Sequence, residues 1–448
     1  MSATTPGSTY RRVGWSSGLH GEDDYALQSK SLSGECAIGI VPRGADFIAQ
    51  HSNITLDEMQ RKNQRPAGPF TRLSILDTMH SASTVAASDT DRYSRQVLFA
   101  PIGEAGQDRL ARSTVAIVGC GATGAASAAL LARAGIGTLI LIDRDFVEES
   151  NLQRQVLFDE ADAAAATPKA EAARRQIARF NSEIQVRAHV ADLVPDNIHA
   201  LLADAQLILD ATDNFETRYL INDYAVEKSS LERGRDSSPE RGRDSSPERG
   251  QYVVPWIYTA AVGAYAATMN ILPGETACLA CLFPSPPSGQ VETCDTAGIL
   301  NTAVNLAASI QVTEALKYLT GARDSMRRTL LAWDLWQNDR SEISAATPRA
   351  GCEVCQARDF AHLRGEGRPH ITLCGRNSVQ IHEHHRPVDL ATTAERLRPH
   401  GDVRQNGLLL QFRRGPHTLT LFADGRALIQ GTTDIALART LYARFVGN

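Results

Sequence analysis

Three charged residues, Arg154, Lys169 and Asp213, follow successive predicted strands, and their chemistry suits transfer of a nucleotide. Two cations at one site neutralise the charge that grows on the phosphates as pyrophosphate leaves a triphosphate. A carboxylate such as Asp213 offers the hard oxygen ligand that Mg²⁺ prefers. A dehydrogenase that only holds the pyrophosphate of NAD needs no such set. The three residues therefore favour chemistry on ATP over hydride transfer.

A glycine-rich turn, Gly119-x-Gly121-x-x-Gly124, lies between a buried apolar run at 115–118 and an alanine-rich stretch at 125–134. Glycines at this spacing permit a tight turn, a close approach of the backbone to phosphate and close packing of the following helix. The N-terminus of that helix favours an anion. The pattern predicts a strand, a phosphate-binding turn and a helix.

A second apolar run, at 138–142, leads to Asp143 and Asp145. Asp143 stands where an acidic residue usually accepts hydrogen bonds from the ribose hydroxyls. The glycine turn and Asp143 by themselves predict only a nucleotide, with NAD as the default. The chain has no G-x-x-x-x-G-K-[ST] motif, which excludes a P-loop hydrolase.

Two C-x-x-C pairs, Cys278/Cys281 and Cys352/Cys355, indicate a closed structural zinc site with four thiolate ligands. An iron–sulfur cluster and four unliganded thiols are the alternatives. Cys294 follows a stretch rich in Pro, Ser and Gly. A thiol on such a loop can have a lowered pKa and act as a nucleophile, or it can have no role.

The elements that position these residues alternate between strand and helix from about 91 to 351, which predicts a Rossmann-like, mostly parallel sheet with helices on both faces. Ligands of such sheets bind at the carboxyl ends of the strands. The helix that begins with Lys169 is expected to have Thr167 as its N-cap and Pro168 at its first position.

We predict three parts of the chain. Residues 1–90 form a disordered leader or precede the true start, 91–356 form the nucleotide-binding domain, and 357–448 form a small α+β domain of unknown function. Inside the second part, residues 229–250 contain Gly-Arg-Asp-Ser-Ser-Pro-Glu-Arg twice in tandem and are expected to be a disordered insertion. A functional Arg/Ser segment is the alternative reading.

Within 357–448, the cluster His382-Glu383-His384-His385 is interpreted as a solvated loop, with metal binding as the alternative.

The net charge of −5 gives no reason to expect nucleic acid or a membrane surface as a partner. No apolar run approaches the length of a spanning helix, about 20 residues. The N-terminus lacks a signal-peptide core. We therefore expect a cytoplasmic protein, in which metal or catalytic roles for cysteine are better supported than disulfides.

Taken together, the motifs resemble those of the ThiF/MoeB/HesA adenylyltransferases, which are related to ubiquitin-activating enzymes. The resemblance covers roughly 91–356. It is carried by Arg92-Tyr93-Ser94-Arg95-Gln96, the glycine turn, Leu141-Ile142-Asp143-x-Asp145, Ser150-Asn151-Leu152-Gln153-Arg154-Gln155, Pro168-Lys169, Thr212-Asp213-Asn214, both C-x-x-C pairs and Thr293-Cys294 to Gly298.

The resemblance implies a role for each matching residue. Nucleotide binding is expected of Gly119, Gly121, Ala122 (often glycine in the family), Gly124, Asp143, Asp145, Asn151, Arg154, Gln155, Lys169, Asp213 and Asn214. Catalytic roles are expected of Arg95, Arg154, Lys169, Asp213 and Cys294. Arg95 would reach the neighbouring subunit's site, which implies a homodimer, and Cys294 matches a cysteine that bonds covalently to the carrier in some members.

The implied activity is ATP-dependent adenylation of the C-terminal glycine carboxylate of a ubiquitin-like sulfur-carrier protein, in thiamine or molybdopterin biosynthesis. ATP, Mg²⁺ and Zn²⁺ are the implied cofactors. A separate sulfur donor is required, because residues 357–448 do not resemble a rhodanese. Three alternatives stay open: activation of another acyl group on a peptide or tRNA, an NAD-dependent oxidoreductase, and a non-catalytic scaffold.

Overall fold

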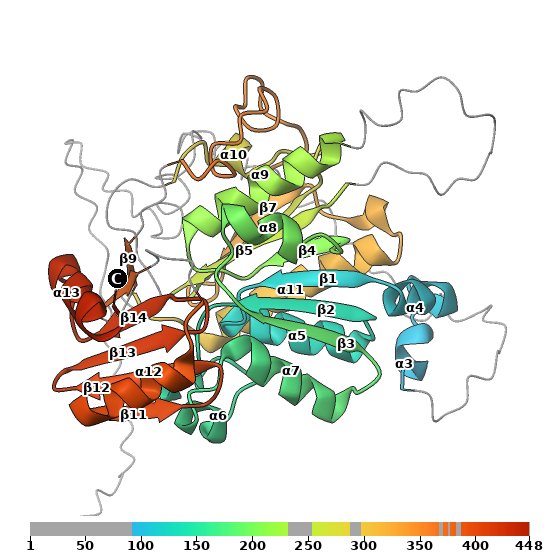
Figure 1. Ribbon diagram of the computed structural model, residues 1–448. Helices are drawn as coiled ribbons and strands as arrows, with labels where there is room; N and C mark the ends of the chain where they lie inside the picture. Colours follow the sequence, from blue (N-terminus) through green and yellow to red (C-terminus); the bar gives the residue numbers. More distant parts are fainter. Residues whose placement is uncertain are drawn as a thin grey trace, which may run out of the picture. The chain divides into compact units, whose positions relative to one another are not determined.

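The computed structural model describes residues 92–231, 253–286, 297–366, 371–374, 377–381 and 387–447 (Figure 1). Four predictions concern residues outside these ranges: the disordered leader, most of the repeat insertion, the nucleophilic Cys294 and the histidine cluster at 382–385.

Among the described residues, eight strands form one sheet in the order β3-β2-β1-β4-β5-β6-β7-β8. The strands from β3 to β5 are parallel, and β6, β7 and β8 continue the sheet antiparallel. Their bounds are β1 Thr114–Val118, β2 Thr138–Asp143, β3 Gln185–Val190, β4 Leu207–Asp210, β5 Trp256–Val262, β6 Tyr265–Ile271, β7 Thr329–Asp334 and β8 Asp339–Ser344. The Rossmann-like α/β class is confirmed; the antiparallel extension is not part of the prediction.

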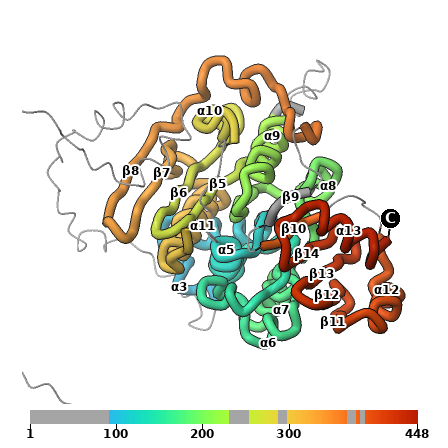
Figure 2. Tube along the Cα trace, turned by 90° about the vertical axis from the view of Figure 1, so that its left-hand side faces the viewer, coloured from blue at the N-terminus to red at the C-terminus, as the bar shows by residue number. Residues whose placement is uncertain are grey.

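Helices cover both faces of the sheet, because successive side chains of a strand point to opposite faces. Val115 and Ile117 of β1 pack in one cluster with α5 (Ala122–Ala134), α7 (Lys169–Phe180) and α11 (Asn301–Leu319). Ala116 and Val118 pack in the other, with α8 (Pro195–Leu201) and α9 (Phe215–Leu231). Figure 2 shows α5 beside α11.

Helix α5 begins directly after the glycine turn and ends at Gly135, whose φ of 83° is the left-handed conformation of a helix C-cap. Its alanines leave room for α11, and the buried Ser127 Oγ donates to Gln311 Oε1 on that helix at 2.8 Å. The alanine-rich sequence therefore serves close helix packing as well as helix propensity.

Short helices complete this part of the chain: α3 Ser94–Val97, α4 Gly103–Ala111, α6 Glu160–Ala164 and α10 Leu279–Leu282, with the 3-10 turns η1 Glu149–Asn151 and η2 Arg323–Ser325. The segment before α4 contacts the end of α5. Gln96 Nε2 donates to Ala134 O at 2.9 Å, and Asn181 Nδ2 donates to the Tyr93 hydroxyl at 3.0 Å. Gln96 of the N-terminal motif thus contacts the end of α5, and Tyr93 contacts the residue that follows α7.

The C-terminal part contains a second sheet, in which six described strands are ordered β11-β12-β13-β14-β10-β9 and pair antiparallel. These elements are β9 Ile371–Cys374, β10 Ser378–Ile381, α12 Leu390–Leu397, η3 Arg398–His400, β11 Asp402–Gln405, β12 Leu409–Arg414, β13 His417–Phe422, β14 Ala427–Gln430 and α13 Ile435–Phe445. The predicted α+β class holds for this part. Strand β11 was not predicted, because its sequence Asp-Val-Arg-Gln has a single apolar residue.

Two local predictions are wrong. Pro168, not Thr167, occupies the N-cap position of α7, and the helix begins at Lys169. Thr167 is instead held in an extended segment, because its carbonyl accepts a hydrogen bond from the Val147 N–H at 2.9 Å. Helix α9 reaches Leu231, so the start of the predicted insertion continues that helix.

No helix in the described part of the chain is both long and apolar enough to cross a lipid bilayer.

Candidate functional site

The predicted nucleotide residues gather at the carboxyl ends of three neighbouring strands. Strand β1 lies between β2 and β4. The glycine turn follows β1, Asp143 ends β2, and Asp213 follows β4. Because the three strands are parallel, these segments meet at one edge of the sheet, as the sequence predicts.

The glycines of the turn differ in what surrounds them. A Cβ on Gly124 would lie 1.8 Å from Gly119 O, and one on Gly119, whose φ is 90°, would lie 2.6 Å from Ala211 O. These two positions need glycine for close backbone packing. A Cβ on Gly121 would meet nothing within 4 Å. The backbone at Gly121 therefore faces open space, as a turn that admits a phosphate requires.

The contrast between the glycines gives a matched test. Gly124→Ala should lower the free energy of unfolding by about 1–3 kcal/mol, because the turn must shift to admit the methyl group. Gly121→Ala adds the same methyl group into open space and should change the free energy of unfolding by less than about 0.5 kcal/mol. Urea unfolding of both variants measures the difference. Equal stability of the two variants would contradict the packing role of Gly124.

Asp143 links the end of β2 to the glycine turn. Its carboxylate, only 8% exposed, accepts hydrogen bonds from the N–H groups of Cys120 at 2.5 Å and Asp145 at 2.7 Å. Burial raises the pKa of the Asp143 carboxyl, and the charge of Lys169 acts in the opposite direction. The side chain fixes the turn relative to β2 and stands at the place predicted for ribose binding.

Lys169 and Asp145 form an ion pair at the start of α7, with Nζ 3.2 Å from Oδ2. Lys169 is buried, while the Asp145 side chain is half exposed. Burial alone would lower the pKa of Lys169, but the carboxylates Asp145, Asp143 and Asp213 outweigh it and raise that pKa. Burial alone would raise the pKa of Asp145, but Lys169 and Arg144 outweigh it and lower that pKa to about 2. Both groups are charged at neutral pH.

The segment around η1 carries Asn151, Arg154 and Gln155. Asn151 is 3% exposed, and its Oδ1 accepts a hydrogen bond from Glu148 N–H at 3.0 Å, which fixes the turn. Arg154 is partly exposed, and its Nη1 donates to Ser150 O at 2.8 Å. Gln155 is buried, and its Oε1 has no partner among the described residues. An orphaned buried amide of this kind fits a site that a ligand completes.

Asp213 and Asn214, which follow β4, have different surroundings. Asp213 is exposed, and its charge acts on Lys169. Asn214 Oδ1 accepts a hydrogen bond from Thr217 N–H at 2.9 Å in the first turn of α9. Asn214 therefore acts as a helix cap in this structure.

A buried ion pair below Asp213 escaped the sequence analysis. Arg218 Nε lies 3.2 Å from Asp210 Oδ2, with side-chain exposures of 6% and 0%. The guanidinium also donates to Thr212 O at 2.5 Å, and Gln311 Nε2 donates to Asp210 O at 2.8 Å. These contacts hold the loop that carries Asp213. An aspartate at the end of an otherwise apolar strand was the one available signal, and nothing near it in the sequence names Arg218 or Gln311 as its partners.

Arg95 lies exposed on α3, and the neighbouring Tyr93 and Gln96 make the contacts described above. A role for Arg95 in another subunit's site stays a prediction.

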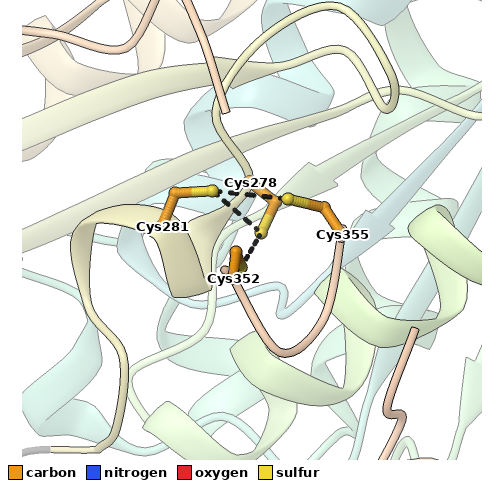
Figure 3. A group of neighbouring side chains, drawn as sticks. All are labelled: Cys278, Cys281, Cys352 and Cys355. Carbon is orange, nitrogen blue, oxygen red and sulfur yellow. Dashed lines mark hydrogen bonds between the residues drawn. The ribbon is translucent and has the colours of Figure 1, made fainter. Parts of the chain in front are cut away.

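The four predicted metal ligands meet in one cluster, shown in Figure 3. Cys278 Sγ lies 3.7 Å from both Cys281 Sγ and Cys352 Sγ, and Cys281 Sγ lies 3.4 Å from Cys355 Sγ. A tetrahedral zinc with bonds of about 2.3 Å to sulfur requires sulfurs about 3.8 Å apart. The donor set and the spacing both fit zinc.

Neighbouring backbone and side chains hold this cluster in place. Asn222 Oδ1 on α9 accepts a hydrogen bond from Leu279 N–H at 2.9 Å, beside the first cysteine pair. Arg349 N–H points at Cys281 Sγ at 3.3 Å, as expected of a donor to a thiolate. Asp223, the next residue of α9, accepts a hydrogen bond from His362 N–H at 3.0 Å. The cluster ties the segment around 352–362 back to α9.

The chain is similar to known proteins. The model of the ThiF family matches residues 93–354. A sulfur carrier protein ThiS adenylyltransferase from Bacillus subtilis is 43% identical over 362 residues, which cover 80% of this chain and 100% of that protein. A SAMP-activating enzyme E1 from Haloferax volcanii is 32% identical over 60% of this chain and 90% of its own length. A probable adenylyltransferase/sulfurtransferase MoeZ from Mycobacterium tuberculosis is 35% identical over 65% of this chain and 69% of its own length.

Proposed function

Because the chain belongs to the ThiF family, we propose that it adenylates the C-terminal glycine carboxylate of a ubiquitin-like sulfur-carrier protein with ATP. The observation that carries the proposal is the Lys169–Asp145 pair at the end of β2, beside an open glycine turn. It is supported by relatives that are named sulfur carrier protein adenylyltransferases, one of which this chain covers over its whole length.

In the proposed reaction a carboxylate oxygen of the carrier attacks the α-phosphorus of ATP. A new P–O bond forms, the bond from the α-phosphorus to the bridging oxygen of the β-phosphate breaks, and pyrophosphate leaves with the electron pair. The nucleophile is already ionised, so no general base is needed. Alignment and charge neutralisation provide the catalysis.

We assign the parts of this reaction to residues at the edge of the sheet. Lys169 and Arg154 neutralise the phosphates, and Asp143 binds the ribose. Asn151 and Gln155 line the phosphate side. The buried cation of Lys169 supports its assignment, since a charge in a partly desolvated site acts more strongly than one in water.

The metal assignments rest on the donor sets. Asp213 is exposed next to Lys169 and would hold Mg²⁺ through a carboxylate oxygen. The four cysteines would hold one zinc, which closes the site and gives it a structural role.

We assign catalysis to the domain predicted at 91–356, which is supported by the extent of the family match. We further propose a cytoplasmic homodimer in which Arg95 completes the partner's site, and a separate protein as sulfur donor. The pathway is that of thiamine or molybdopterin, as the names of the relatives suggest.

Exchange of labelled pyrophosphate into ATP tests the proposal. The purified protein with Mg²⁺ and a carrier that ends in Gly-Gly should catalyse the exchange, because adenylation is reversible before the acyl group moves on. A carrier without its last glycine is the matched control and should give background exchange. If no exchange occurs with a thiamine-type carrier or with a molybdopterin-type carrier, the proposal is overturned. If exchange occurs with a free peptide carboxylate instead, the enzyme activates another acyl substrate.

A further inference from the structure

The C-terminal sheet contacts the two segments that carry the Lys169–Asp145 pair. Leu409 of β12 and Phe422 of β13 are buried against Phe146 and Ala166. Asn406 Nδ2 donates to the carbonyls of Ala165 and Ala166, each at 3.1 Å. Phe146 follows Asp145, and Ala166 precedes Lys169 by three positions. The contact therefore reaches both sides of the pair.

These two segments are also joined to each other. Phe146 and Pro168 form an isolated antiparallel bridge, and Lys169 N–H donates to Asp145 O at 2.9 Å. Because the two segments are bonded to each other, a shift of either one would move both Asp145 and Lys169.

Arg426, which directly precedes β14, makes the polar part of the contact. It is 4% exposed, and its Nη1 donates to Arg144 O at 3.3 Å, between the two nucleotide-site aspartates. The Nε of Arg426 donates to Asp424 Oδ2 at 2.7 Å, and its Cζ lies 4.2 Å from the centre of the Phe422 ring. Nearby, Gln430 Nε2 donates to Glu148 Oε1 at 3.2 Å.

The burial of Arg426 is costly for stability. Its Nη2 is buried and has no hydrogen-bond partner among the described residues, so this N–H group loses its bonds to water and gains none in return. An apolar side chain would fill the same space without that cost. Its charge does act on the nucleotide site, since Arg426 is one of the cations that hold the pKa of Asp145 down.

We propose that Arg426 is a positioning residue for ATP, and that through it the C-terminal domain clamps the segment of residues 144–148. The inference rests on the proposed function, because it concerns the same site. Arg426 touches the backbone next to Asp143 and Asp145 rather than the reacting atoms. Its loss should therefore weaken the hold on ATP in the ground state and the transition state alike, which raises KM and leaves kcat nearly unchanged.

The experiment compares wild type with Arg426→Ala, Arg426→Lys and a control, Arg414→Ala. Arg414 is an exposed arginine of the same sheet, and its guanidinium stacks on Phe445 within the C-terminal part. Arg426→Ala should raise KM for ATP and its calorimetric Kd about tenfold, with kcat within about twofold. Arg426→Lys, which keeps a charge and a donor, should recover part of the loss, and Arg414→Ala should match wild type.

The outcomes separate the two proposals. If Arg426→Ala lowers kcat with KM and Kd unchanged, Arg426 only maintains the folded fraction and the inference is wrong. Wild-type values of KM and Kd overturn it as well. If wild type binds ATP but exchanges no pyrophosphate with any carrier, the proposed function fails, and the calorimetric Kd of the variants still decides the role of Arg426.

Discussion

Replacing Lys169 with alanine should lower the rate of carrier-dependent pyrophosphate exchange by a factor of about 10²–10³. Lys169 is a buried cation whose raised pKa keeps it charged, and it pairs with Asp145, two residues after the end of β2. In the proposed reaction this charge is fixed in advance beside the departing pyrophosphate and needs no reorganisation, which is why its removal should act on kcat.

The matched control is Arg174→Ala, on the same helix. Arg174 is exposed and pairs with Glu171 of the same helix at 2.7 Å, so exchange should stay within about twofold of wild type. Loss of Lys169 removes a counter-charge from the buried carboxylate of Asp143 and from Asp145, so the variant is also expected to lose stability. Arg154→Ala tests the same role without removing a buried charge. Arg154 is partly exposed and bonds only to Ser150 O within the described residues, and its loss should slow exchange in a folded protein. Normal rates in both variants would refute the assigned roles.

Lys169→Ala together with a new variant, Arg95→Ala, tests the homodimer. Arg95→Ala should also lose exchange if Arg95 acts in the partner's site. Mixed dimers of Arg95→Ala and Lys169→Ala then contain one site with both residues, so that mixing should restore part of the activity. Two inactive variants that never complement each other would argue against a shared site.

Loss of the metal is expected to have the second large effect. Cys352→Ser should abolish the binding of about one zinc per chain and destabilise the fold by several kcal/mol, because metal binding at a structural site contributes directly to folding free energy. Cys352 is fully buried, so water cannot reach this position to replace the lost thiolate as a metal ligand. Metal analysis and thermal unfolding measure the two effects, and a strong chelator should reproduce the second in wild type.

Cys294→Ala is the control for the metal prediction. It should retain zinc and the wild-type melting temperature, and it should spare adenylation while blocking any covalent adduct with the carrier. A Cys352→Ser protein with full zinc content and unchanged unfolding would exclude the four-cysteine site.

Much of the site was predictable because its residues lie in short, local motifs. The glycine turn, Asp143 and Lys169 each sit next to a strand or at a helix start that the apolar pattern identifies, and parallel strands bring their carboxyl ends together. The resemblance to the ThiF family is confirmed by the family match over residues 93–354. The four-cysteine cluster was predictable from the spacing within each C-x-x-C pair, although the two pairs are separated by about 70 residues.

Other features were not predictable, because they join residues that no local pattern connects. Thr167 has the sequence of an N-cap, yet the bond from Val147 pulls its carbonyl into an extended bridge. Gln311 contacts the carbonyl of Asp210 from a helix 101 positions away. The polar strand β11 forms because β12 pairs with it, not because of its own side chains.

The sequence by itself determined the glycine turn, the order of the charged residues and the two cysteine pairs, since each depends on residues a few positions apart or at successive strand ends. Only the tertiary structure decided that Lys169 is buried and paired with Asp145, that Arg218 supports the loop of Asp213, and that Arg426 reaches the backbone beside Asp143. The physical reason is that burial and charge pairing depend on which surfaces are covered, and those surfaces come from segments up to 282 residues apart.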